Sequence, residues 1–175
     1  MKDVLLRASR MEDVESITKI YTHYVLHSAS SFETDPPDEK EMLRRRAHTL
    51  ELKLPYLVAE IDGVVTGYAY ATPYRPRAAY RYTVENSVYI HADHARKGLG
   101  RLLLTDVIRA CEEFGARQMV AVIGDSGNVA SIGLHLACGF RHVGVLNAVG
   151  FKFGRWVDTV LMQRQLSAGA SSLPV

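Results

Sequence analysis

The sequence has little of what marks the more specialised classes of protein. Its 175 residues include only two cysteines, Cys111 and Cys138, and no Cys-x-x-Cys pair, which fits a reducing compartment. No apolar run approaches the roughly 18 residues that a membrane-spanning helix needs. The first ten residues lack the apolar stretch of a signal peptide. We therefore expect a cytoplasmic protein that does not enter a membrane.

Neither sign of charge is in large excess. Lys and Arg number 21 against 19 Asp and Glu, for a formal charge of +2, whereas a nucleic-acid-binding protein would show a strong basic excess. The histidine pairs His23/His27 and His91/His94 lack a neighbouring carboxylate or thiol cluster, so no metal site is expected. The composition shows no break, which predicts one domain over residues 1–166 and a flexible tail over 167–175.

Hydrophobic patterns predict alternating helices and strands. A short strand at 4–9 precedes a helix that starts near Arg10, where Ser9 and Glu12 have capping-box spacing, and a second helix ends near Leu52. Asp62-Gly63 lies between two β-rich runs and is typical of a type I′ hairpin turn. The later elements are a strand at 82–91, a helix at 98–114, a strand at 118–124, a helix capped by Asn128 or Ser126, and two closing strands. This order predicts a mixed α/β fold with an antiparallel front and a parallel crossover around the 98–114 helix.

The segment "HARKGLGRLLL" at residues 94–104 predicts an anion site. A helix N-terminus offers free N–H groups and a partial positive charge, and glycines let the backbone approach a phosphate closely. A P-loop would need Gly-Lys-Ser/Thr after the second glycine, and a Rossmann turn would need a third glycine at position 103, which is Leu. An ordinary glycine turn between a strand and a helix is the remaining alternative.

Two blocks carry a family resemblance. Gly98 and Gly100 match the pattern Gln/Arg-x-x-Gly-x-Gly/Ala, although its first position is Ala95 here. "NVASIGLHLACGF" at 128–140 matches a second block, with His135 where Tyr is usual. Both resemble the Gcn5-related N-acetyltransferases (GNAT), whose glycine loop holds the pyrophosphate of acetyl-CoA.

Longer stretches narrow the resemblance. "IYTHYVLHSASSFE", "PYLVAEIDGVVTGYAYA", "YRPRAAYRYTVENSVYI" and "GFKFGRWVDTVLMQRQL" together resemble the phosphinothricin and methionine-sulfoximine acetyltransferase branch, over about residues 3–166. The resemblance implies a mostly antiparallel central sheet flanked by helices, with the parallel crossover at the acetyl-CoA site. It also implies a small-molecule amine acceptor and a homodimer.

The resemblance assigns residues to the donor site. The pantetheine arm would pair with the strand at Val88, Tyr89 and Ile90. Asn128 would contact the cofactor arm together with Ser131. The residues expected around the pyrophosphate are Arg96, Lys97, Gly98, Leu99, Gly100 and Arg101.

Catalytic residues are also implied. Glu85, at the position of the branch carboxylate, is the candidate base, because a carboxylate can take the ammonium proton directly or through one water. The alternative is a structural carboxylate paired with Arg81. His135 is the candidate acid by position, and a histidine satisfied within its helix is the alternative.

The acceptor site is predicted from a cationic loop and two further positions. Guanidinium groups bind carboxylates and phosphinates bidentately, and they crowd the segment just before the catalytic strand. The candidate acceptor residues are Phe32, Glu33, Arg75, Arg77, Tyr80, Arg81 and Glu85.

The sequence therefore predicts an acetyl-CoA-dependent N-acetyltransferase that acts by direct attack on a small amine bearing a carboxylate, such as phosphinothricin or methionine sulfoximine. Two rivals stay open. One is another acceptor, such as a protein N-terminus or a polyamine, although a polyamine pocket should be acidic. The other is a CoA-binding sensor without turnover, against which Glu85 argues.

Overall fold

The structure, a computed structural model, describes residues 3–173. The ends of the predicted domain and tail, residues 1–2 and 174–175, lie outside the described residues. The elements are β1 (Val4–Ala8), α1 (Val14–His27), α2 (Glu39–Glu51), β2 (Tyr56–Ile61), β3 (Val64–Pro73), β4 (Thr83–Ile90), α3 (Leu99–Phe114), β5 (Gln118–Gly124), α4 (Val129–Ala137), β6 (Arg141–Lys152) and β7 (Arg155–Gln165). Their order is the predicted one, with three single-turn 3-10 helices added between elements.

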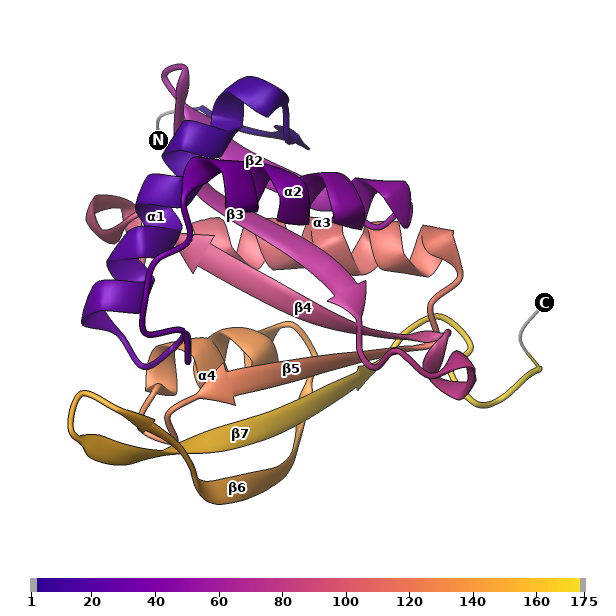
Figure 1. Cartoon of the computed structure of the whole chain (residues 1–175). Helices are drawn as coiled ribbons and strands as arrows, with labels where there is room; N and C mark the ends of the chain where they lie inside the picture. The colour runs from indigo at the N-terminus through magenta and orange to yellow at the C-terminus, as the bar shows by residue number, and fades with distance from the viewer. Residues whose placement is uncertain (1–2, 174–175) are drawn as a thin grey trace.

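The seven strands form one twisted sheet in the order β1-β2-β3-β4-β5-β7-β6 (Figure 1). All neighbouring pairs are antiparallel except β4 and β5, which α3 connects as a parallel crossover. The predicted mixed α/β sheet with an antiparallel front is therefore confirmed. No helix between residues 3 and 173 is long and apolar enough to cross a bilayer.

The sheet has a different core on each face, and the sequence of β3 shows why. Successive strand residues point to opposite faces. Tyr68 and Tyr70 lie on the face covered by α1 and α2, whereas Ala69 and Ala71 lie on the face covered by α3. The small alanine side chains let α3 pack closely, while the tyrosine rings fill the wider space beneath α1 and α2.

The predicted hairpin turn is confirmed, and one of the two candidate caps of α4 is observed. Asp62 and Gly63 both have positive φ, at 52° and 79°, as a type I′ turn requires. Asn128 caps α4, with its Oδ1 accepting from Ser131 N at 3.1 Å, whereas Ser126 donates to Asp158.

The predicted Ser9–Glu12 capping box is wrong. The Ser9 hydroxyl accepts from Arg46 Nε of α2 at 2.8 Å, and a 3-10 turn at Met11–Asp13 precedes α1. Asp13 instead accepts from Arg10 N at 2.6 Å.

The C-terminal segment continues beyond β7 as turns. Leu166 is buried, and the Arg117 guanidinium donates to Ser172 Oγ at 3.1 Å and to the Leu173 carbonyl at 3.2 Å. The domain boundary at residue 166 and the flexibility of the tail stay predictions.

Candidate active site

The site begins where β4 and β5 separate. Their parallel pairing covers only Thr83 to Glu85 on β4, opposite residues 118–120 of β5. At the next position the contact between the strands is made by the side chain of Asn86, whose Nδ2 donates to the Val120 carbonyl at 3.2 Å. Beyond this fork the facing edges of the two strands are free of each other. A backbone edge without a strand partner can bind an extended ligand.

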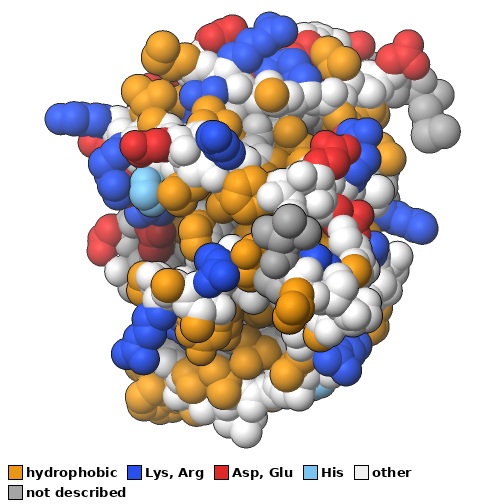
Figure 2. All heavy atoms as spheres, turned by 90° about the vertical axis from the view of Figure 1, so that its right-hand side faces the viewer, with side chains coloured by type: hydrophobic (Ala, Val, Ile, Leu, Met, Phe, Trp, Pro, Cys, Tyr) orange, Lys and Arg blue, Asp and Glu red, His pale blue; other side chains and the backbone are white. Residues whose placement is uncertain are grey.

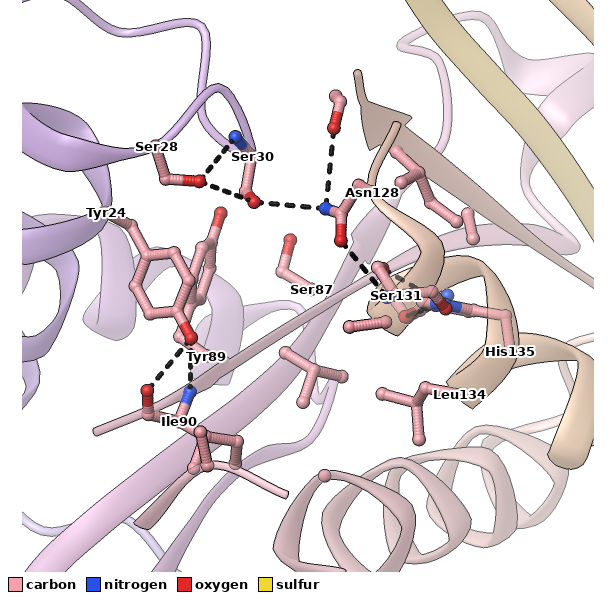
Figure 3. A pocket seen from close by; sticks show the side chains of 18 of the residues that line it. Tyr24, Ser28, Ser30, Ser87, Tyr89, Ile90, Asn128, Ser131, Leu134 and His135 are labelled. Atoms are coloured by element: carbon pink, nitrogen blue, oxygen red, sulfur yellow. Dashed lines mark hydrogen bonds between the residues drawn. The ribbon is translucent and has the colours of Figure 1, made fainter. Parts of the chain in front are cut away.

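A cavity of about 710 Å³ fills the space beyond the fork (Figure 3). Such a volume is within the range of small-molecule sites, and residues from β4, β5, α4 and the glycine loop all face it. The residues predicted for the donor that line the cavity are Val88, Tyr89, Ile90, Arg96, Gly98, Gly100, Arg101, Asn128 and Ser131. Val122 of β5 faces the same space, which explains the exposure of its side chain within a strand.

The glycine loop forms a tight turn at the start of α3. Arg96 and Gly98 have positive φ, at 60° and 84°, so the backbone curves tightly before the helix. No side chain caps the first turn of α3, which leaves its N–H groups for a ligand. A Cβ at Gly100 would press on Leu134 of α4, so glycine also keeps the two helices close.

Two predicted donor residues lie away from the cavity wall. The Lys97 ammonium donates to the Asp93 carbonyl at 2.7 Å on the surface, and the Leu99 side chain is buried in the core beneath α3. Neither lines the cavity. The side chain of Lys97 therefore contributes charge at a distance, whereas Leu99 can contribute only its backbone.

Asn128 joins three parts of the site. Besides capping α4, its Nδ2 donates to Ser30 Oγ at 3.1 Å and to the Gly124 carbonyl at 3.4 Å (Figure 3). Ser28 Oγ donates to Ser30 Oγ at 2.8 Å. The end of α1 is thereby attached to the start of α4 across the mouth of the cavity.

Glu85 is half-buried at the fork, and no hydrogen bond or ion pair joins its carboxylate to any residue between 3 and 173. Arg81 instead stacks on the Tyr82 ring, with 4.6 Å between its Cζ and the ring centroid, so the ion pair considered as the alternative role of Glu85 is not formed. Burial raises the pKa of Glu85, and the charge of Arg75 acts in the opposite direction. A carboxylate with a raised pKa and a free face is suited to accept a proton near neutral pH.

His135 is buried, at 4% exposure, between α4 and the fork. Its Nδ1 is 2.8 Å from the Ser131 carbonyl and its Nε2 is 3.0 Å from Asn86 Oδ1. Burial lowers the pKa of His135, while the Ser131 carbonyl raises it. A doubly protonated ring would donate to both oxygens, whereas burial favours the neutral ring. The hydrogen bonds and the burial of His135 therefore favour different protonation states.

The cationic loop between β3 and β4 lies outside the cavity. Arg75, Arg77 and Arg81 are all exposed, and Arg75 stacks on the Tyr74 ring at 5.0 Å. Tyr80 is exposed and packs edge-to-face on Tyr74, with 5.7 Å between the ring centroids. Of the three arginines, only Arg75 acts on the pKa of Glu85.

Glu33 lies on the other side of the same corner. Its carboxylate accepts from Arg45 at 2.7 Å and from the Tyr21 hydroxyl at 2.9 Å. Burial raises the pKa of Tyr70, and the charges of Arg45, Glu85 and Glu33 all act on it. The charges of Glu33 and Glu85 thus both act on the Tyr70 hydroxyl, while Phe32 packs against Gly150 of β6.

Sequence reasoning missed several residues of the cavity wall. Asn86 and Ser87 follow Glu85 directly on β4, and a buried asparagine inside a strand could have been flagged as needing a partner. Tyr24 of α1 also lines the cavity, and its hydroxyl donates to the Ile90 carbonyl at 2.9 Å.

Known acetyltransferases are similar to this chain in sequence. A phosphinothricin N-acetyltransferase of Alcaligenes faecalis is 57% identical over 169 residues, which is 97% of this chain and 86% of that protein. An L-methionine sulfoximine/L-methionine sulfone acetyltransferase of Salmonella typhimurium is 43% identical over 166 residues, or 95% of this chain and 96% of that protein.

A solved structure is also similar. The crystal structure of a phosphinothricin acetyltransferase from Sinorhizobium meliloti, in complex with AcCoA, is 42% identical with a TM-score of 0.96, covering 98% of this chain and 93% of that one. The model of the acetyltransferase (GNAT) family matches residues 17–140, more than half of the sequence. The chain therefore belongs to the acetyltransferase (GNAT) family.

Proposed function

We propose that the protein acetylates the amino group of a small amino-acid analogue that carries an acidic group, of the phosphinothricin or methionine sulfoximine type. Family membership makes it an N-acetyltransferase that takes the acetyl group from acetyl-CoA. The observation that carries the proposal is the unpaired carboxylate of Glu85, which lies at the fork between the donor cavity and the cationic loop. The relatives named above act on the same class of acceptor.

The residues of the chain divide the chemistry between them. The glycine loop and the free edge of β4 fit the donor, which when bound supplies an acetyl group on a thioester. As the new N–C bond forms, the thioester C–S bond breaks and a thiolate leaves. Glu85 takes the proton that the acceptor ammonium must lose. His135 is the candidate to protonate the thiolate, and its protonated ring would be held by Ser131 and Asn86.

Arg75 is the proposed partner of the acceptor's acidic group. It is the exposed guanidinium whose charge reaches Glu85, so an anion bound to it would bring the acceptor amine toward the base. Arg77, Arg81 and Tyr80 complete the exposed rim of this loop. Phe32 and Glu33 close the corner from the opposite side.

The experiment that tests the function is thiol release from acetyl-CoA across a panel of amines. We expect the highest kcat/KM with phosphinothricin or methionine sulfoximine, and lower values with a short peptide or a polyamine. A peptide used best would mean an N-terminal acetyltransferase. Binding of acetyl-CoA without turnover of any amine would mean a sensor.

Replacing Glu85 with Gln should lower turnover about 100-fold or more at neutral pH, and the acidic limb of the pH–rate profile should disappear. The thermal stability of Glu85→Gln should instead increase. Burial raises the pKa of Glu85 above its value in the unfolded chain, so stability falls as the pH rises past the ordinary value and the loss is complete above the raised pKa. The variant should therefore unfold at a higher temperature at pH 7. Glu113→Gln, at an exposed position, is the control, and unchanged turnover in Glu85→Gln would exclude a base at this position.

Replacing Arg75 with Ala should lower kcat/KM for an acidic acceptor about 10- to 150-fold, the range expected for one lost charge-assisted hydrogen bond. The acceptor amide provides the comparison, because wild-type protein should use it poorly and the variant should impair it little further. Arg109→Ala, on the exposed face of α3, is the matched control. Equal losses with acid and amide would contradict a role in binding the acidic group.

We also propose that the protein is a cytoplasmic homodimer. Both cysteines are free and buried, which suits a reducing compartment. β6 is an edge strand, and hydrophobic side chains gather at the lower end of the face in Figure 2, at the height of β6 in Figure 1. Large exposed apolar patches mark interaction surfaces. The exposed hydrophobic residues of β6, β7 and their turn are Val143, Val145, Leu146, Val149, Phe151, Phe153 and Trp156.

Sedimentation should give about twice the 19.5 kDa mass of the chain. Trp156, at 66% exposure, contacts Phe151, so Trp156→Glu should shift the species toward the monomer. Val64→Glu, at an exposed hydrophobic position on β3, should leave the mass unchanged. A wild-type protein that sediments as a monomer would refute the dimer.

A further inference from the structure

Lys152, the last residue of β6, is a charged side chain in a buried place. The residue is 5% exposed, and among residues 3–173 no carboxylate forms an ion pair with its ammonium. Burial lowers its pKa, and the charge of Glu33 raises it. A lysine is rarely buried unless its ammonium has strong partners, because removing a charge from water is costly.

The partners of Lys152 are two backbone carbonyls of one loop. Its Nζ donates to Ser28 O at 2.8 Å and to Ser31 O at 2.7 Å. Both belong to residues 28–33, the 28–33 loop, which leaves the end of α1. The ammonium therefore holds this loop at two points, from a strand more than a hundred residues later in the sequence.

Two glycines make room for the same loop. A Cβ at Gly124 of β5 would overlap the Ala29 carbonyl, and a Cβ at Gly150 of β6 would overlap the Phe32 ring. Ala29 is buried, whereas Phe32 is partly exposed. The loop is thus seated on the β5 and β6 strands by shape as well as by hydrogen bonds.

The loop connects the two halves of the site. Ser28 and Ser30 line the donor cavity, and Ser30 accepts from Asn128 (Figure 3). At the other end, Glu33 faces the acceptor corner and is held by Arg45 and Tyr21. A shift of the loop would move Phe32 and Glu33 relative to Glu85, whereas Asn128 would keep its own bonds to Ser131 and Gly124.

We propose that Lys152 is a positioning residue for the acceptor, because its hydrogen bonds to the 28–33 loop set where Phe32 and Glu33 stand. The inference rests on the proposed function, since it concerns how that acceptor is bound. Lys152 is not among the residues that line the donor cavity. Its effect should therefore appear in the acceptor KM more than in the acetyl-CoA KM.

The first test is Lys152→Met, which keeps an unbranched side chain but removes the donor. We expect the acceptor KM to rise about 10-fold or more, with a smaller change for acetyl-CoA. Amide hydrogen exchange of the 28–33 loop should become faster, because its opening is no longer opposed by the ammonium. Lys152→Arg, which can donate to two carbonyls, should recover part of both effects. Lys40→Met, at an exposed lysine of α2, should change neither.

The second test reaches the loop without touching Lys152. Gly150→Ala should displace the Phe32 ring, which is partly exposed and can turn away without unfolding the protein, and should raise the acceptor KM. Gly144→Ala, on the same strand with open space around its Cβ, is the matched control. This pair keeps the inference testable even if Lys152→Met fails to fold.

The outcomes separate the inference from the proposed function. A wild-type enzyme that uses the acidic analogues, with Lys152→Met and Gly150→Ala both keeping its acceptor KM, would overturn the positioning role. An equal or larger effect on the acetyl-CoA KM would do the same. If the wild-type protein acetylates none of the analogues, the proposed function fails, and hydrogen exchange of the 28–33 loop then decides whether Lys152 holds it.

Discussion

The early separation of β4 from β5 is the constraint on which the whole site depends. Parallel pairing ends at Glu85, so the backbone beyond it has a free edge, and the N-terminal turns of α3 and α4 face the gap. The separation leaves the Val120 carbonyl at the apex without a ladder partner. The Asn86 side chain donates a hydrogen bond to this carbonyl through Nδ2, and its Oδ1 lies within hydrogen-bonding distance of His135 Nε2. A buried polar residue in the middle of a strand is thus what lets the sheet open.

Burial around the fork sets the electrostatics of the site. The tyrosines of the α1/α2 face stack closely, with Tyr56 and Tyr70 at 4.9 Å and Tyr68 and Tyr89 at 5.2 Å between ring centroids. Burial raises the pKa of Tyr68 and Tyr89 well above the usual value, so their hydroxyls stay neutral. Burial likewise raises the pKa of Glu85, the candidate base. Burial also lowers the pKa of His135. It therefore shifts the pKa values of the two candidates for proton transfer in opposite directions.

The proposed acceptor corner is assembled from segments that are distant in sequence. The 28–33 loop, the β3–β4 loop and the end of β6 each supply one side of it, and hydrogen bonds to other elements add to those within each loop. Lys152, Asn128 and Arg45 therefore act as connections between elements, each using its hydrogen bonds on loop atoms. These bonds explain how the 28–33 loop is held against the rest of the protein.

Patterns within single segments determined the order of elements, the two faces of the sheet and the glycine loop. The Tyr-Ala alternation of β3, the Asp62-Gly63 turn and the glycines at 98 and 100 each act over a few residues, so the sequence alone reveals them. Contacts between segments were decided only by the tertiary structure. Ser9 binds Arg46 instead of capping a helix, Asn86 binds Val120, and Lys152 binds Ser28 across 124 positions. A periodic pattern indicates which face of its own segment is apolar. The partner of a polar group depends instead on how whole elements pack, and this packing follows from burial across the entire sheet.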